Sequence, residues 1–367
     1  MSTQRARFSD LVGPMETLIE ACREGDAASV RRILRRGGSQ LDIVTSSSTT
    51  SSDVSVSATP LMMSIIQDHE ECVRLLLAAH ANPNVACGKH EETALHVCCA
   101  RGKIDFARLL IDAGADIGAS DVLGRSPLLM SCLCDHPECT ELMLKARAEI
   151  EQSMVRHNPG ATPLYAAALA GSLRSVALLC DAGANVDAKN HDGATPMMVS
   201  SQQGHLKTCM LLSSYGASRE RTVFKGCVPT TGTWAEDLAL RSGNEELVSW
   251  LRESKSFGPL HHIEVLTPQR TLALLRSGRF SPLKGGSSCP AARAHTYPAN
   301  ESASLILRAS EPWSPATHEL WGRRHRAFAV ELLRIGYRLR AKYGDALFDA
   351  WLTHVMPHSV SWEVDEW

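Results

Sequence analysis

The chain has 367 residues, a formal net charge of −2 and an isoelectric point near 6.7. This balance gives no overall electrostatic attraction to nucleic acid or anionic lipid, so nucleic acid is not expected as a partner. The N-terminus lacks the apolar core of a signal peptide, and no run of residues is long and apolar enough to span a membrane. We therefore expect an intracellular protein, with the cytoplasm ahead of the nucleus as its compartment.

The chain opens with a tail, residues 1–14, followed by two short helical patterns over 15–38. Leu18, Ile19, Cys22 and Val30 supply apolar positions, and Gly25 falls at the turn between the two patterns. The next segment, 45–57, consists mostly of Ser and Thr and cannot form a core. We interpret it as a flexible insertion in a loop, and phosphorylation of its hydroxyls is the alternative role.

The stretch from Ala161 to Asp187 contains the unit that recurs along most of the chain. Thr162 is placed to cap a helix, Pro163 suits its first position, and Gly171 supplies a left-handed turn before a second helix. The capping residue recurs every 33–36 residues, at Thr59, Thr93, Ser126, Thr162 and Thr195. A period of this size indicates stacked units that bury their apolar faces against one another.

The repeated unit resembles the ankyrin repeat. The resemblance rests on motifs such as Thr59-Pro60-Leu61, Thr93-Ala94-Leu95-His96 and Thr162-Pro163-Leu164, and on helix ends such as Gly114-Ala115-Asp116 and Gly183-Ala184-Asn185. It implies an all-α fold, an ankyrin-repeat solenoid of about seven to eight stacked helix-turn-helix units with β-hairpin-like fingers, plus a C-terminal helical segment. On this basis residues 15–278 form the ankyrin-repeat domain, 279–300 a linker and 301–367 a C-terminal helical extension.

The repeat pattern loosens toward the C-terminus. An insertion over 222–233 precedes a seventh unit at Trp234, and an eighth would begin at Pro259 and end at Gly278. Five of the seven tryptophans lie in the last 55 residues, where 328–343 has the spacing of an amphipathic helix and 346–356 that of a second one. These helices either cap the open end of the solenoid or dock onto another protein, and capping is the preferred interpretation. The basic run over 323–342 is interpreted as a solvated helix face, and the alternative is that it binds an acidic partner, a membrane surface or RNA.

One segment has the composition of a zinc site. Cys132, Cys134, His136 and Cys139 offer four possible ligands, but the repeat pattern places Cys132 and Cys139 in the apolar faces of two helices. Core packing is therefore the preferred explanation, and no bound metal is expected.

Catalytic motifs are lacking as well. The sequence has no P-loop and none of the common hydrolase, metalloprotease or dinucleotide-binding motifs. His96 and His261 fall where the ankyrin repeat has a histidine bonded to the start of its own helix. We therefore expect no enzyme, no catalytic residue and no cofactor.

The resemblance implies an extended concave surface without a dedicated pocket, which binds another protein through the fingers and first helices. The outward positions in this frame are Lys89, His90, Glu92, Arg101, Val122, Leu123, Arg125, Asn158, His191, Asp192, Gln202 and Gln203. Val122 and Leu123 either anchor an interface or fill space between adjacent fingers. We expect a monomeric, non-enzymatic scaffold or adaptor for a protein partner. The alternative is a substrate-recognition subunit of a ubiquitin ligase that docks through the C-terminal helices.

The repeat frame makes a prediction about stability. Leu178→Asp should place an unpaired charge in the stacked core and lower the free energy of unfolding by several kcal/mol. His191→Asp, at a fingertip, should leave the melting temperature almost unchanged. Thermal unfolding followed by circular dichroism compares both variants with the natural chain, and equal losses would show that the frame is misplaced.

Overall fold

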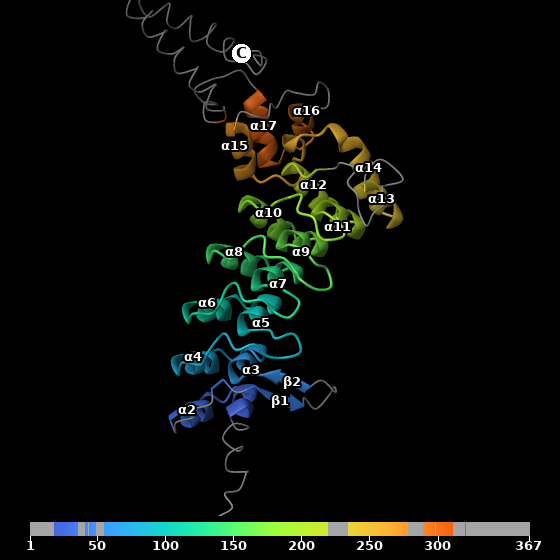
Figure 1. Ribbon diagram of the computed structural model, residues 1–367. Helices are drawn as coiled ribbons and strands as arrows, with labels where there is room; N and C mark the ends of the chain where they lie inside the picture. Colours follow the sequence, from blue (N-terminus) through green and yellow to red (C-terminus); the bar gives the residue numbers. More distant parts are fainter. Residues whose placement is uncertain are drawn as a thin grey trace, which may run out of the picture. The chain divides into compact units, whose positions relative to one another are not determined.

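The computed structural model describes residues 18–35, 41–42, 44–48, 55–218, 234–277, 289–297 and 299–310, together with Leu320. The predicted N-terminal tail, the 222–233 insertion, the 323–342 basic run and the helices predicted over 328–356 lie outside the described residues, which Figure 1 draws as a grey trace. The chain divides into two compact units. The first is 1–208 with 220–242, and the second is 209–219 with 243–367.

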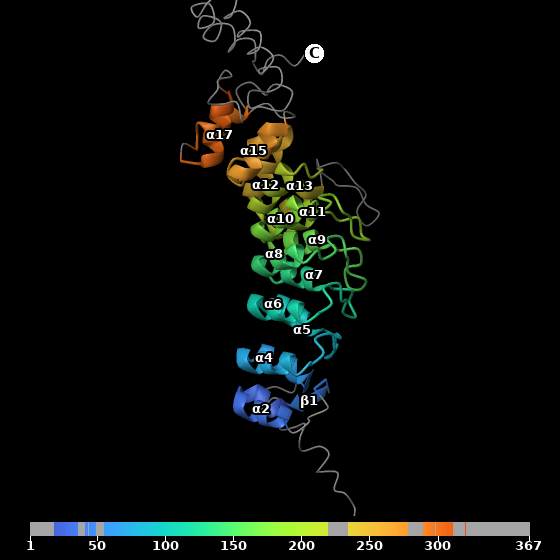
Figure 2. The ribbon, with the colours of Figure 1, turned by 90° about the vertical axis from the view of Figure 1, so that its left-hand side faces the viewer.

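The first unit is built from pairs of short helices joined by tight turns. The first helices contact one another in series from α3 to α13, and the second helices do so from α2 to α10. Figures 1 and 2 show the resulting two rows, with the finger loops on one side. The pairs are residues 18–24 with α2 (Ala27–Arg35), α3 (Pro60–Ile66) with α4 (Glu70–Ala78), α5 (Ala94–Arg101) with α6 (Ile104–Asp112), α7 (Pro127–Leu133) with α8 (Pro137–Lys145), and α9 (Pro163–Ala170) with α10 (Leu173–Asp181). Helices α11 (Pro196–Gln203) and α13 (Trp234–Arg241) continue the row of first helices, whereas most of α12 (Leu206–Ser214) belongs to the second unit.

The Ser/Thr-rich segment begins and ends in a β-hairpin. Strands β1 (Thr45–Ser48) and β2 (Ser55–Ala58) pair antiparallel, with Thr45 opposite Ala58 and Ser48 opposite Ser55. Strand pairing satisfies the backbone N–H and C=O groups of a segment that has no core of its own. The segment predicted as a flexible insertion is therefore paired at both ends and forms the first finger.

The predicted capping residues do cap the first helices. The hydroxyls of Thr59, Ser126, Thr162 and Thr195 each accept a hydrogen bond from the backbone N–H three residues further on, at 3.2–3.3 Å. A proline occupies the start of all four helices. Each cap satisfies one of the N–H groups that a helix start leaves without a partner, so the capping prediction is confirmed here.

Helix α5 has no proline and uses His96 at its start. His96 Nδ1 accepts the backbone N–H of Thr93 at 3.2 Å, and His96 Nε2 lies 2.9 Å from the carbonyl oxygen of Arg125. Because a carbonyl only accepts, the ring proton is on Nε2 and Nδ1 is the acceptor. Burial lowers the pKa of His96, which favours this neutral form. The predicted role at the helix start is confirmed, and the same ring bonds to the next finger.

Successive repeats contact each other at a joint. The residue just before the second helix of one repeat packs against the inter-helix turn of the preceding repeat. Gly102 has φ +68°, and a Cβ there would lie 2.6 Å from His136 Nδ1, so the imidazole lies directly against the glycine. His136 Nε2 donates to the carbonyl oxygen of Ala100 at 3.1 Å. The same pair of contacts occurs at two other joints, Gly25 with His69 and Gly171 with His205.

Where the turn residue is aspartate, the facing residue is different. Asp68 and Asp135 take the same left-handed conformation, with φ of +68° and +57°. At the first of these, the next repeat has Lys103, whose Nζ lies 2.7 Å from Asp68 Oδ2. In the repeat after Asp135, the residue before the second helix is the small, buried Ser172, whose hydroxyl donates to Ser175 Oγ at 2.9 Å. A side chain at the turn leaves no room for an imidazole, so the residue type at the turn selects its neighbour.

The core of the first unit lies between the two rows of helices. Its largest fully buried side chains include Leu95, Leu110, Leu128, Met143, Leu164 and Leu179. On α10 the buried positions are Ser175, Val176, Leu179 and Cys180, whereas Leu178 is only half-buried. Leu178 therefore lies at the edge of the core, not in its centre as expected, and Leu179→Asp is the more severe form of the charge substitution.

The second unit has its own hydrophobic core. It contains α14 (Glu245–Glu253), the short 3₁₀ helices η1 (Ser254–Ser256) and η2 (Pro259–His261), α15 (Pro268–Ser277), α16 (Pro290–Ala294) and α17 (Glu301–Ser310). Helix α17 contacts both α15 and α16. The buried residues of this core include Leu260, Ile263, Leu274, Leu275, Ala294, Ala303, Ile306 and Leu320.

This packing differs from the domain boundaries that the sequence suggested. The expected linker 279–300 contains α16 and the buried Cys289 and Ala294, and the boundaries at 278 and 301 cross one core shared by α15 and α17. The seventh predicted unit is divided, because α13 belongs to the first unit and α14 to the second. Ala and Pro carry little apolar signal in a sequence, yet they allow short helices to approach closely.

In the predicted eighth unit, His261 Nδ1 accepts the N–H of Gly258 at 2.9 Å, as expected for a histidine at its own helix start.

Gly171→Ala tests the contact at the joints. Its Cβ would lie 2.8 Å from the His205 ring at φ +75°, whereas at Gly183, with φ +93°, no atom lies within 4 Å of a Cβ. We expect Gly183→Ala to cost about 1–2 kcal/mol from backbone strain alone. Gly171→Ala should cost about 1–3 kcal/mol more, because the ring must move.

The shift of the urea unfolding midpoint measures both losses. The double variant Gly171→Ala with His205→Ala should recover part of the difference, since the smaller side chain removes the clash. Equal losses for Gly171→Ala and Gly183→Ala would show that the histidine contact does not hold the joint.

Candidate functional site

Each finger is a short loop that closes on itself. After the β1–β2 hairpin, the second finger is 85–92, the third 118–125, the fourth 152–160 and the fifth 186–194. In the second finger Cys87 and Glu92 exchange two backbone hydrogen bonds of 3.0 Å. In the fourth, Met154 N–H donates to the oxygen of Ala161 at 3.0 Å, and the fifth is closed in the same way. These bonds fix the fingertips relative to the helices.

Neighbouring fingertips are also joined to each other. The N–H of Val122 donates to the oxygen of His90 at 2.9 Å, and that of Val155 to the oxygen of Leu123 at 2.8 Å. The N–H of His191 donates to the oxygen of Pro159 at 2.8 Å. The four fingertips thus form one continuous surface, which we call the fingertip ribbon. It consists of Lys89, His90, Val122, Leu123, Val155, Arg156, His157, Asn158, Lys189 and His191.

Arg125 connects the second and third fingers through ion pairs. Its guanidinium lies 2.6 Å from Asp121 Oδ2 and 2.9 Å from Glu92 Oε1, and the Asp121 side chain is fully buried. Asp121 Oδ1 also accepts the N–H groups of Leu123 and Arg125, at 2.9 and 2.8 Å. Glu92 and Arg125 were both predicted as partner contacts, and the structure brings them together in a network that holds the fingers.

The fourth finger has an exposed apolar residue that the sequence analysis did not select. The Val155 side chain is 68% exposed, whereas Val122 and Leu123 in the neighbouring finger are half-buried. Counted back from Thr162, Asn158 corresponds to Val122 and His191 in the neighbouring repeats and was selected on that basis. Val155 was missed because the spacing of 36 residues from Ser126 to Thr162 inserts extra residues in this finger, and it lies among them. An apolar residue among polar loop neighbours is the signal that could have found it.

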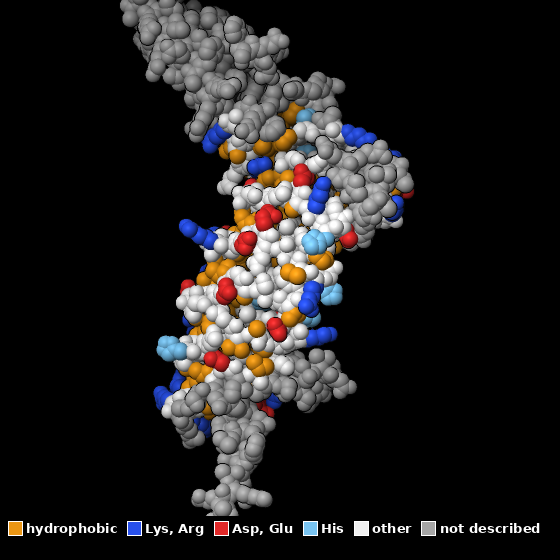
Figure 3. Space-filling model, viewed as in Figure 1, with side chains coloured by type: hydrophobic (Ala, Val, Ile, Leu, Met, Phe, Trp, Pro, Cys, Tyr) orange, Lys and Arg blue, Asp and Glu red, His pale blue; other side chains and the backbone are white. Residues whose placement is uncertain are grey.

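Three cations of the ribbon have no ion pair among the described residues. They are Lys89, Arg156 and Lys189, on the second, fourth and fifth fingers. On the second helices, Arg74 and Lys145 pair with glutamates at 2.6 and 2.7 Å, while Arg108 and Lys207 are exposed and have no ion pair among the described residues. Figure 3 shows Lys, Arg and His side chains along the edge of the first unit on which the fingers lie.

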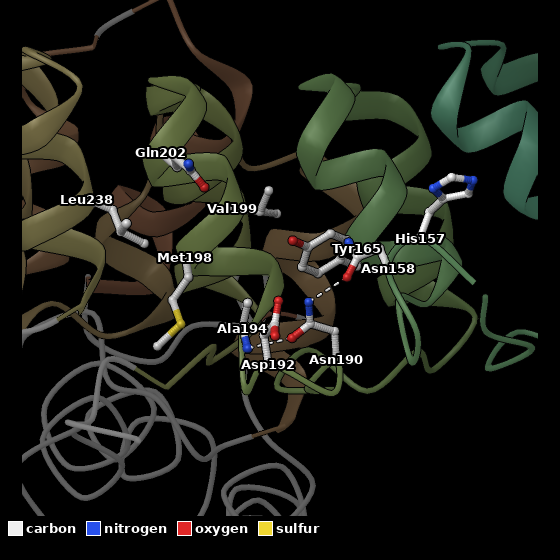
Figure 4. Close-up of a pocket in the computed structure, with 10 residues that line it drawn as sticks. All are labelled: His157, Asn158, Tyr165, Asn190, Asp192, Ala194, Met198, Val199, Gln202 and Leu238. Atoms are coloured by element: carbon white, nitrogen blue, oxygen red, sulfur yellow. Dashed lines mark hydrogen bonds between the residues drawn. The ribbon is translucent and has the colours of Figure 1, made fainter. Parts of the chain in front are cut away.

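A hollow adjoins the ribbon between the fourth and fifth fingers and helices α9, α11 and α13. It has a volume of about 240 Å³, and its lining includes His157, Asn158, Tyr165, Asp192 and Gln202 (Figure 4). Small-molecule sites usually have about 300–1,000 Å³, so this hollow suits a single side chain. The expectation of a surface without a dedicated pocket is corrected to this extent.

Hydrogen bonds fix the rim of the hollow. Asn158 Oδ1 accepts from Asn190 Nδ2 at 2.6 Å, and Asn190 Oδ1 accepts the N–H of Ala194 at 2.7 Å (Figure 4). Tyr165 is only 8% exposed, and Figure 4 shows its hydroxyl directed toward Val199 in the lining. The hollow is therefore formed by side chains that are already held in place.

The other predicted residues lie on the same face. Asn158, Asp192 and Gln202 line the hollow, and Gln203 is exposed on α11. Arg101 ends α5 and donates to the oxygen of Ile66 at 3.3 Å. Binding by the predicted residues stays a prediction. Some of them lie on the ribbon or line the hollow, whereas Arg125 and Glu92 are already paired with each other.

The cysteine and histidine segment is spread across a repeat joint. Cys132 and Cys139 are buried and Cys134 is exposed, while His136 bonds Ala100 in the preceding repeat. Burial raises the pKa of Cys132 to about 12, whereas zinc binds the thiolate. In the part of the chain that the structure describes, no group of three or more His, Cys, Asp or Glu could hold a metal ion. The same part contains no helix that could cross a membrane.

Comparison with known proteins gives consistent matches. The family model for ankyrin repeats matches residues 18–121 and 118–190. Human ankyrin repeat and SOCS box protein 16 is 32% identical over 192 residues, which make up 51% of this chain and 40% of that protein. The E3 ubiquitin-protein ligase XBAT32 of Arabidopsis thaliana is 29% identical over 212 residues, which make up 49% of this chain and 40% of that protein. The chain thus spans less than half the length of these curated relatives.

A solved structure is similar over most of its own length. The crystal structure of the ankyrin repeat domain of Bcl-3, a member of the IkappaB family, has a TM-score of 0.52 and 27% sequence identity. The match covers 64% of this chain and 97% of that structure.

Arg125→Ala distinguishes a structural role from a contact role. The substitution leaves the buried Asp121 carboxylate without its cation, although two backbone N–H groups still bind it. We expect a loss of about 1–3 kcal/mol in the free energy of unfolding. The exposed Arg156→Ala should change it by less than about 0.5 kcal/mol. Urea denaturation compares the two variants. Equal stabilities would show that Arg125 has no structural role, and it would then again be a candidate contact residue.

Proposed function

Because the chain is an ankyrin-repeat protein, we propose that it is a non-enzymatic scaffold or adaptor whose partner protein binds the fingertip ribbon and the adjoining hollow. Ankyrin repeats imply protein–protein interaction and typically form modules without catalytic activity. The matches and the two rows of helices confirm the predicted resemblance and the all-α solenoid. The partner is proposed to contact the face of the repeats that carries the fingertip ribbon and the hollow.

One observation carries the proposal: the finger face leaves apolar surface and a hollow open while backbone hydrogen bonds join its fingertips. The fingertips are joined by backbone hydrogen bonds of 2.8–2.9 Å, so little conformational entropy is lost when a partner binds. Val155 offers an exposed apolar contact, and the hollow can receive one side chain of the partner. These are the features of an interface anchor surrounded by polar groups.

A substrate-recognition role in a ubiquitin ligase is the second candidate. The names of two relatives include a SOCS box and an E3 ubiquitin-protein ligase, and both alignments cover about half of this chain. The predicted docking helices, 328–356, lie outside the described residues. Capping remains the preferred role for the C-terminal segment, since the core of the second unit already extends to Leu320.

Affinity capture with the full chain tests the proposal. The finger-face variant combines Val155→Glu with Gln202→Glu, which places two carboxylates on the ribbon and in the hollow. The control combines Ala113→Glu with Ala182→Glu, at exposed positions just after α6 and α10. We expect the finger-face variant to lose its protein partners and the control to retain them, with equal melting temperatures.

Retention of all partners by the finger-face variant would contradict the proposed face. A further form that lacks 321–367 but keeps the core to Leu320 addresses the second candidate. If that form loses a ubiquitin-ligase complex while it still binds other partners, the C-terminal segment is a docking element and not a cap.

A further inference from the structure

We propose that the partner segment on the fingertip ribbon is an extended acidic polypeptide with an apolar side chain that packs against Val155. The inference rests on the proposed function and adds the chemistry of the partner. It follows from the charges that the fingers leave open, from those already engaged, and from the apolar contact between them.

The open cations are distributed along the ribbon. Lys89 lies on the second finger, Arg156 on the fourth and Lys189 on the fifth, and all three are exposed. None of them has an ion pair among the described residues. Because the fingertips are linked in series, a ligand that satisfies all three must run along the ribbon, as an extended chain does. A compact anion bound at one fingertip does not extend along the ribbon in this way.

The acids on the same fingers are mostly engaged. Asp121 and Glu92 pair with Arg125, and Asp187 and Asp192 each have an interaction within the protein. Glu91 is the exposed acid on these fingers for which no ion pair is found among the described residues. The four fingers together carry four Lys or Arg and five Asp or Glu, but three of the cations and one of the acids are exposed without an ion pair among the described residues. The charges that a partner can still pair with are therefore mostly positive.

Val155 supplies the apolar contact in the middle of these cations. Its N–H bonds Leu123, so its backbone is fixed, while its side chain is 68% exposed. It lies beside Gly124, where a Cβ would be 2.7 Å from Val155 Cγ2. The half-buried Val122 and Leu123 extend this apolar strip on the neighbouring finger. An apolar residue between acidic ones in the partner matches this order.

A polypeptide suits this surface better than a nucleic acid. Single-stranded nucleic acids are usually held by aromatic side chains that stack on the bases as well as by cations. The second to fifth fingers, 85–92, 118–125, 152–160 and 186–194, contain no Phe, Trp or Tyr. Tyr165, the aromatic residue that lines the hollow, is buried on α9.

Fluorescence anisotropy of the full chain with defined probes tests the inference. The probes are a labelled peptide with two central leucines flanked by glutamates, the same peptide with lysines or glutamines in place of the glutamates, and a labelled oligouridine. The ribbon variant combines Lys89→Glu, Arg156→Glu and Lys189→Glu. The matched control combines Arg108→Glu, Arg147→Glu and Lys207→Glu, three exposed cations on or next to second helices, with the same change in net charge.

We expect the glutamate peptide to bind most tightly and to weaken at least about tenfold with the ribbon variant, but by no more than about twofold with the control. Val155→Ser should also weaken it. Tighter binding of the lysine peptide or of oligouridine, no binding of the glutamate peptide, or equal losses in both variants would overturn the inference. Since the proposed function is judged by capture of native partners, such a failure would remove only the acidic class of partner.

Discussion

The contact between a left-handed turn and the residue that faces it from the next repeat is the constraint on which the first unit depends. A glycine without Cβ lets an imidazole lie against the chain and donate to the carbonyl two residues before the turn, as His136 does at Gly102. Where the turn is Asp68, the joint is an ion pair to Lys103 instead. Both arrangements fix the distance and rotation between neighbours, because the bonded atoms belong to turns that are themselves fixed.

This constraint transmits order to the fingers. Each finger emerges from a helix pair whose position is set at the joint, so neighbouring fingertips arrive within hydrogen-bond distance, as at His90 with Val122. His96 adds a second connection, because it caps α5 and also bonds Arg125 in the next finger. The finger face is consequently rigid without a core of its own, which favours recognition with a small loss of entropy.

Much of this could be predicted from the sequence, because the repeat places the same residue type under the same physical demand. The caps at Thr59 and Thr162 and the left-handed turns follow from the motif alone. The register could not show that Glu92 and Arg125 engage each other, since ion pairs between fingers depend on side-chain reach. Val155 lay in an insertion outside the register. The 279–300 segment resembled a linker because its alanines become apolar contacts only when helices pack.

Different residues of the repeat provide stability and recognition, so the residues of the binding face can vary without loss of stability. Stability resides in the caps, turns and joints, whose residue types are tightly restricted, while the fingertips are held by backbone bonds that any non-proline side chain permits. Changes at Lys89, Val155 or Lys189 therefore leave the joints intact and alter only what the ribbon presents. An insertion such as that around Val155 adds contact surface at little cost, because its ends remain tied by the bond between Met154 and Ala161. Recognition in this chain is accordingly expected to concentrate where the sequence departs from the repeat.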